Sequence, residues 1–113
     1  MTHATFLEEE FADAAITQLV AEGAQLRLFV LNWRDQDQLL VFEGVIGLES
    51  QSFINAALSH ADQVGDDDFL RRCCDLAGET MGGFHCYRFY SAWIASPLLK
   101  IVARGFRLEA IVD

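Results

Sequence analysis

Residues 24–48 read AQLRLFVLNWRDQDQLLVFEGVIGL, two apolar runs separated by four polar residues. The polar residues 34–37 have the length of a hairpin loop. The flanking runs, 24–33 and 38–48, are rich in the side chains that strands prefer. This stretch therefore predicts a β-hairpin.

Both faces of the first predicted strand are apolar. Alternation places three aliphatic side chains on one face, and two aromatic side chains and a leucine on the other. The two sets are Leu26, Leu28 and Val30, and Phe29, Leu31 and Trp33. A strand with two apolar faces is either central in a covered sheet or part of an interface. We therefore consider Phe29, Leu31 and Trp33 as possible anchors for a partner.

Three further segments have the pattern of strands. Residues 84–95 are rich in aromatic side chains, and residues 106–113 alternate apolar with mostly charged residues. Residues 98–104 form a third run, and Gly105 between the last two predicts a bend or bulge in a continuing strand.

The main helix is predicted at residues 66–77. Three leading aspartates supply an N-cap and a negative first turn, and Gly78 stands where a C-cap glycine belongs. Phe69, Cys73 and Leu76 recur at helical spacing. The patterns of residues 6–22 and 50–62, in contrast, fit either a helix or a strand. The expected fold is thus a single α+β domain over residues 1–113, dominated by a curved antiparallel β-sheet of about five or six strands.

Charge and composition limit the classes of function. The chain is 52% hydrophobic with a formal net charge of −9, and residues 1–68 have a net charge of −11 against +2 for residues 69–113. Such an acidic half repels nucleic acid and anionic membranes and attracts a basic protein, although it also serves solubility. The run Glu8, Glu9 and Glu10 is either a solvated face or a contact for that partner.

The sequence predicts no membrane span, no secretory signal and a cytoplasmic protein. No apolar run is long enough to cross a bilayer, and the N-terminus has neither a basic region nor an apolar core. Three cysteines, two of them adjacent, cannot form a closed disulfide framework. This cysteine usage fits a reducing compartment.

Four residues have the chemistry of zinc ligands: Cys73, Cys74, His85 and Cys86. Adjacent cysteines on a helix diverge by about 100°, and neighbours on a strand point to opposite faces. Structural zinc sites instead use pairs two to four residues apart. We therefore predict that the cysteines are buried in the core and that the protein holds no metal or cofactor. A metal site and a reactive thiol are the alternatives.

No catalytic residue is predicted, because the sequence lacks a nucleophile elbow and a phosphate-binding glycine loop. A weaker ligand-binding hypothesis concerns the aromatic strand 84–95. Alternation places His85 and Tyr87 on one face and Arg88 and Tyr90 on the other, and either face could line a concavity with hydrogen-bonding groups in an apolar wall.

The chain also resembles a broad group of small, uncharacterised bacterial proteins, some of which are described as immunity-type proteins of polymorphic toxin systems. Five segments carry the resemblance: FADAAITQL (11–19), the hairpin from LRLF to VIGL (26–48), DDDFLRRC (66–73), FHCYRFYSA (84–92) and LLKIVARGF (98–106). The resemblance implies the fold, favours strand or loop for the two open segments, and brings no catalytic residues.

The leading expectation is a non-enzymatic cytoplasmic protein that binds another protein, as an immunity-type inhibitor of a basic toxin would. The acidic half, with Glu8, Glu9 and Glu10, would meet the basic partner. The alternatives are a small-molecule-binding or enzymatic module at the aromatic strand, and a homodimer that associates through residues 26–33. Nucleic-acid and membrane partners are not expected.

Overall fold

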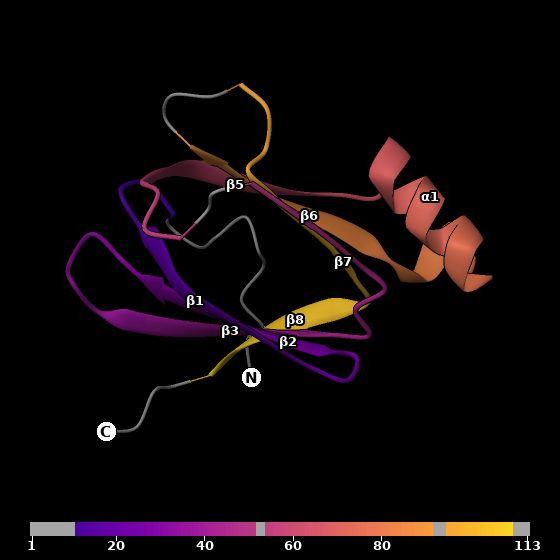
Figure 1. Ribbon diagram of the computed structural model, residues 1–113, viewed down its shortest axis with the longest axis horizontal. Helices are drawn as coiled ribbons and strands as arrows, with labels where there is room; N and C mark the ends of the chain where they lie inside the picture. The colour runs from indigo at the N-terminus through magenta and orange to yellow at the C-terminus, as the bar shows by residue number, and fades with distance from the viewer. Residues whose placement is uncertain (1–10, 52–53, 92–94, 110–113) are drawn as a thin grey trace.

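The computed structural model describes residues 11–51, 54–91 and 95–109 (Figure 1). Within these ranges the chain forms eight strands, one α-helix and one short 3-10 helix. Their bounds are β1 (Ala15–Glu22), β2 (Gln25–Leu31), β3 (Asp37–Glu43), β4 (Gly47–Ser50), β5 (Leu58–Val64), α1 (Asp68–Ala77), η2 (Met81–Gly83), β6 (His85–Ser91), β7 (Leu99–Ala103) and β8 (Gly105–Glu109). The predicted α+β class, with antiparallel sheet and one main helix, is confirmed.

The strands form two four-stranded antiparallel sheets. Sheet A has the order β1-β2-β3-β8 and sheet B the order β4-β7-β6-β5. The sequence predicts five or six strands in one curved sheet, whereas the described residues form eight strands in two. The difference arises because two long apolar runs each break in the middle and pass from one sheet to the other.

The breaks are at Gly44 and next to Gly105. Residues 38–48 are predicted as one strand, but β3 ends at Glu43 and Gly44 has φ +64°, a left-handed conformation that glycine adopts without strain. A Cβ at Gly44 would also lie 2.7 Å from the Arg104 side chain. The chain changes direction next to Gly105 as predicted, but the strand does not continue, because β7 belongs to sheet B and β8 to sheet A. Residues 110–113 of the predicted last strand lie outside the described residues.

The two segments left open between helix and strand both contain strands, β1 and β5. Each has a register shift in its pairing, between Ile16 and Gln18 and between Leu58 and His60. An extra residue in a strand changes the spacing of its inward side chains from two to three. Ile16 and Leu19 both reach the core, as do Leu58 and Ala61. Apolar residues three positions apart are also typical of an amphipathic helix, so the sequence pattern of these bulged strands resembles that of a helix.

The main core lies between the two sheets. Its most buried members include Leu26, Leu28 and Val30 of the hairpin, the three side chains that alternation places on one face of the strand. Aromatic rings fill the space between the sheets: Phe42 lies 5.0 Å from Tyr87 between ring centroids, and Phe11 lies 5.3 Å from Phe89. The edge-to-face geometry of both pairs is one that aromatic rings prefer.

Both ends of α1 are capped as predicted. The Asp67 side chain accepts hydrogen bonds from the backbone N–H groups of Phe69 and Leu70 at 2.8 and 3.2 Å. Gly78 is left-handed at φ +70°, and the N–H of Glu79 donates to the Cys74 carbonyl at 2.9 Å. This is a Schellman ending, in which glycine lets the last carbonyls find donors.

Helix α1 packs on the outer face of sheet B (Figure 1). Leu70, Cys73 and Cys74 face the sheet, whereas the predicted stripe through Phe69 and Leu76 is wrong at its end, because Leu76 is 90% exposed. The stripe that contacts the sheet is displaced by about one residue, to the side of the helix that carries Leu70 and Cys74.

Gly47 of β4 allows this close approach, and its replacement is expected to disturb the helix. A Cβ at Gly47 would overlap the Cys73 sulfur. Gly47→Ala should therefore lower the free energy of unfolding by about 2 kcal/mol, measured by urea denaturation. Gly65→Ala is the matched control, because a Cβ there meets nothing within 4 Å. Equal stability of the two variants would contradict close packing at Gly47.

Candidate functional site

The loop between β2 and β3 is a three-residue turn held by Asn32. We call residues 32–36 the hairpin tip. The Asn32 side-chain oxygen accepts from the backbone N–H groups of Arg34 and Gln36, both at 2.9 Å, and the Asn32 N–H donates to the Gln36 carbonyl at 3.0 Å. Asp35 has φ +58°, as the third residue of such a turn requires. The tip thus has a fixed conformation before any contact with a partner.

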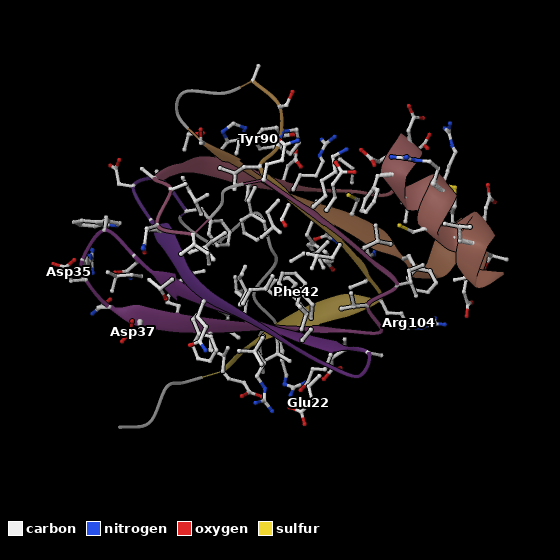
Figure 2. The ribbon with its side chains drawn as sticks, viewed as in Figure 1. Glu22, Asp35, Asp37, Phe42, Tyr90 and Arg104 are labelled. Carbon is white, nitrogen blue, oxygen red and sulfur yellow. The ribbon has the colours of Figure 1, made fainter. Side chains whose placement is uncertain are left out.

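The hairpin tip presents an aromatic ring and acidic groups to solvent. Trp33 is 53% exposed, and the guanidinium of Arg34 lies 4.6 Å from the centre of its ring. Asp35 in the tip and Asp37, the first residue of β3, are exposed, and neither forms a salt bridge within the described residues. Figure 2 shows both carboxylates at the end of sheet A opposite α1.

The outer face of sheet A extends from the hairpin tip. Phe29 and Leu31 are half-buried on it. The charges beside them are paired: Arg27 with Glu22 at 3.8 Å, and Arg107 with its neighbours Glu43 and Glu109. Of the residues predicted to bind a partner, Phe29, Leu31 and Trp33 therefore lie on or next to one face, while Glu8, Glu9 and Glu10 lie outside the described residues.

A second polar group lies on the outer face of sheet B, beside α1. Asp62 of β5 and Arg88 of β6 are cross-strand partners, and two parallel hydrogen bonds of 2.6 Å join them. Tyr90 donates its hydroxyl proton to Asp62 at 3.3 Å. Arg88 and Lys100 each lie 3.5 Å from the Asp67 carboxylate. The helix N-cap is thus tied directly to β6 and β7, and through Arg88 to Asp62 of β5.

The pKa values in this cluster follow its charges. Burial alone would raise the pKa of Asp67, but hydrogen bonds from backbone amides and the Lys100 ammonium outweigh it, so the pKa lies below its ordinary value. The hydrogen bonds that Arg88 donates to the Asp62 carboxylate raise the pKa of Arg88. Burial and the Asp62 carboxylate raise the pKa of Tyr90. All three groups therefore keep their charge state at neutral pH, and the cluster is an ion-pair tether.

The residues of the ligand-binding hypothesis are divided between the two faces of β6. Tyr87 is buried in the core, where burial raises the pKa of its hydroxyl to about 12, and His85 is half-buried beside it. Arg88 and Tyr90 point to the opposite face and contact Asp62. The structure therefore does not bring these four residues into one pocket.

Ser59 and His60 form a contact that the sequence does not predict. The Ser59 hydroxyl lies 2.8 Å from His60 Nδ1 and also donates to the Tyr90 carbonyl at 3.3 Å. The His60 ring is stacked on Tyr90, with ring centroids 4.4 Å apart. The Ser59 hydroxyl therefore lies between a histidine ring nitrogen and a backbone carbonyl, within hydrogen-bond distance of both.

The three cysteines belong to the apolar cluster between α1 and sheet B. Cys73, Cys74 and Cys86 are free and buried. Burial raises the pKa of all three thiols, that of Cys86 to about 12, so they are poor nucleophiles at neutral pH. No group of three or more potential metal ligands is present in the described part of the chain.

Sequence reasoning missed the contacts that depend on pairing across strands. Asp62 and Arg88 are 26 residues apart, and Asp62 lies in a segment whose strand character was open. Asn32 did give a local signal, because an asparagine at the end of a strand often accepts hydrogen bonds from backbone N–H groups a few residues later in a turn. The prediction of a loop at residues 34–37 did not use this signal.

No family model, curated protein or solved structure matches this chain. None of the described helices is long and apolar enough to cross a membrane.

Proposed function

We propose that this protein binds another protein through the hairpin tip and the adjoining outer face of sheet A. The proposal rests on Trp33, a large aromatic side chain held half-exposed on a preorganised turn. Tryptophan is among the residues that dominate the energy of interfaces, and a turn that is already ordered loses little entropy on binding.

The charge of the chain supports a basic partner. Asp35 and Asp37 follow Trp33 in the chain and form no salt bridge among the described residues, so a cationic side chain could approach them without displacing a neighbour. A net charge of −9 would speed the encounter.

An immunity-type inhibitor of a basic toxin is the specific form of this proposal, and it rests on the family resemblance. Such a protein acts by occupying its partner and needs no catalytic residues. We further propose a cytoplasmic location, since three free, buried thiols are typical of a reducing compartment.

The test is capture of a partner by variants of the hairpin tip. Tagged wild-type protein, Trp33→Ala and the control Leu76→Ala are incubated with extract of the source cells, and retained polypeptides are measured by quantitative mass spectrometry. Both replaced side chains are exposed, but Leu76 lies on α1. We expect a basic polypeptide whose recovery falls at least about tenfold with Trp33→Ala and is unchanged with Leu76→Ala.

The captured polypeptide must then bind the purified protein directly. High salt and the double variant Asp35→Asn/Asp37→Asn should both slow its association. Equal binding by wild type and Trp33→Ala would reject the hairpin tip as the contact, and association that does not respond to salt would reject the electrostatic part.

A further inference from the structure

The last described strand, β8, has one edge that no described strand pairs with. β8 pairs with β3 on one side. On the other side, β6 pairs with β7 only as far as the His85–Ala103 pair, and the residues before it form η2, whose Gly83 lies close to the Arg104 side chain. About half of the backbone N–H and C=O groups of a strand point to each side, so β8 presents hydrogen-bonding groups along this edge.

The side chains of β8 are complementary to a second copy of the same strand. Arg107 and Glu109 lie on the outer face of sheet A, opposite in charge and separated by one residue. Leu108 between them is 39% exposed. If two copies of β8 pair in antiparallel orientation about an axis through Leu108, each Arg107 lies opposite the Glu109 of the other copy, and the two leucines face each other.

Other symmetric registers are less favourable. A two-fold axis normal to the sheet keeps each side chain on its own face, so the pairing can shift only in steps that preserve the alternation. An axis through Arg107 would place two guanidinium groups opposite each other, and like charges directly across a strand pair are destabilising. An axis through Glu109 would likewise place two carboxylates opposite each other, and an axis through Phe106 would place Arg107 opposite Gly105 without an ion pair. Of these four registers, the axis through Leu108 is the one that places Arg107 opposite Glu109.

We infer that this protein forms a homodimer in which the β8 strands of two copies pair in antiparallel orientation and join their sheets A into one continuous sheet. The opposite charges across the new pair fix the register, and the strand edge supplies the backbone hydrogen bonds. This surface differs from β2, an internal strand of sheet A, and from the hairpin tip, so the inference goes beyond the proposed function.

Charge-reversal variants test the register. Analytical ultracentrifugation over a wide concentration range should show a dimer for the wild type. Arg107→Glu and Glu109→Arg should each raise the dissociation constant at least about tenfold, because two attractive pairs become repulsive. When the two variants are mixed in equal amounts, acidic and basic edges face each other, and a heterodimer should form at wild-type affinity.

Arg27→Glu is the control, because it makes the same charge change on the same face of sheet A but on internal strand β2. It should leave the dimer intact. Hydrogen exchange of the wild type gives a second readout that needs no variant: β8 amides directed away from β3 should become more protected as the protein concentration rises.

A wild type that stays monomeric at millimolar concentration would overturn the inference. So would a dimer that both charge variants retain, or single-variant monomers that do not associate on mixing. None of these outcomes depends on capture of a basic partner by the hairpin tip, so the two proposals can fail separately.

Discussion

Phe42→Ala is expected to lower the free energy of unfolding by about 4 kcal/mol, the largest effect of any single change considered for this protein. Phe42 is fully buried at the centre of the core between the sheets. Its ring contacts Tyr87 of sheet B and Phe106 of β8, with centroids 5.0 and 6.1 Å away. Truncation would leave a cavity where the two sheets meet, and strand pairing would keep the walls from closing it.

Urea denaturation of the wild type and of Phe42→Ala measures this effect. Trp33→Ala is the control, because it also removes a large aromatic ring but from a site that is 53% exposed. Its loss should stay below about 1 kcal/mol, since surface substitutions away from special features have small effects. A similar loss in both variants would mean that the core between the sheets is not packed around Phe42. The control also shows whether the variant used for partner capture is folded.

The second large effect is expected for Asp67→Ala, at about 3 kcal/mol. Asp67 has two roles, because one oxygen caps α1 and the other faces Lys100 and Arg88. Loss of an N-cap costs about 1 kcal/mol, and loss of a hydrogen bond to a charged group costs about 1.5–3 kcal/mol. The Asp67 side chain is only 8% exposed, so water replaces these contacts poorly.

Two neighbouring variants separate the roles of Asp67. Asp68→Ala removes a carboxylate that is 94% exposed and contacts only Arg71 among the described residues, so its effect should be small. Asp67→Asn keeps a side chain that caps helices well but removes the charge, and its stability should fall between those of the wild type and Asp67→Ala. If Asp67→Asn is as stable as the wild type, the ion pairs to sheet B contribute nothing.

The same residue predicts a dependence on pH. The pKa of Asp67 is lower in the folded protein than its ordinary value of about 3.9. Its stabilising contribution is therefore complete above that value and is lost as the pH falls through the lower folded pKa. The difference in stability between the wild type and Asp67→Ala should accordingly shrink below about pH 4. A difference that stays constant down to about pH 2 would contradict the lowered pKa.

The sequence predicted those elements whose signals are local. The hairpin loop follows from polar residues between two apolar runs, and α1 follows from an aspartate N-cap and Gly78, because capping and turn chemistry involve residues close in the chain. The strands β1 and β5 were left open, since a bulge in each gives its inward side chains a spacing of three.

The candidate sites depended on the sequence to different degrees. Phe29, Leu31 and Trp33 could be selected from the sequence, because a strand with two apolar faces is unusual wherever it is placed. The tether of Asp62, Arg88 and Lys100 to Asp67 could not be predicted from the sequence, because these residues meet only through the pairing register of β5, β6 and β7.

The sequence by itself determined the class of fold, the hairpin and the helix with its caps. It also determined that the chain is acidic and that one strand has two apolar faces. Only the tertiary structure decided that two apolar runs bend into separate sheets, that β8 has an edge with which no described strand pairs, and which charges meet. The physical reason is that periodicity and capping act within a few residues, whereas strand pairing joins residues far apart in the chain. The choice among pairings is made by burial of the whole core, in which Phe42 of one sheet meets Tyr87 of the other.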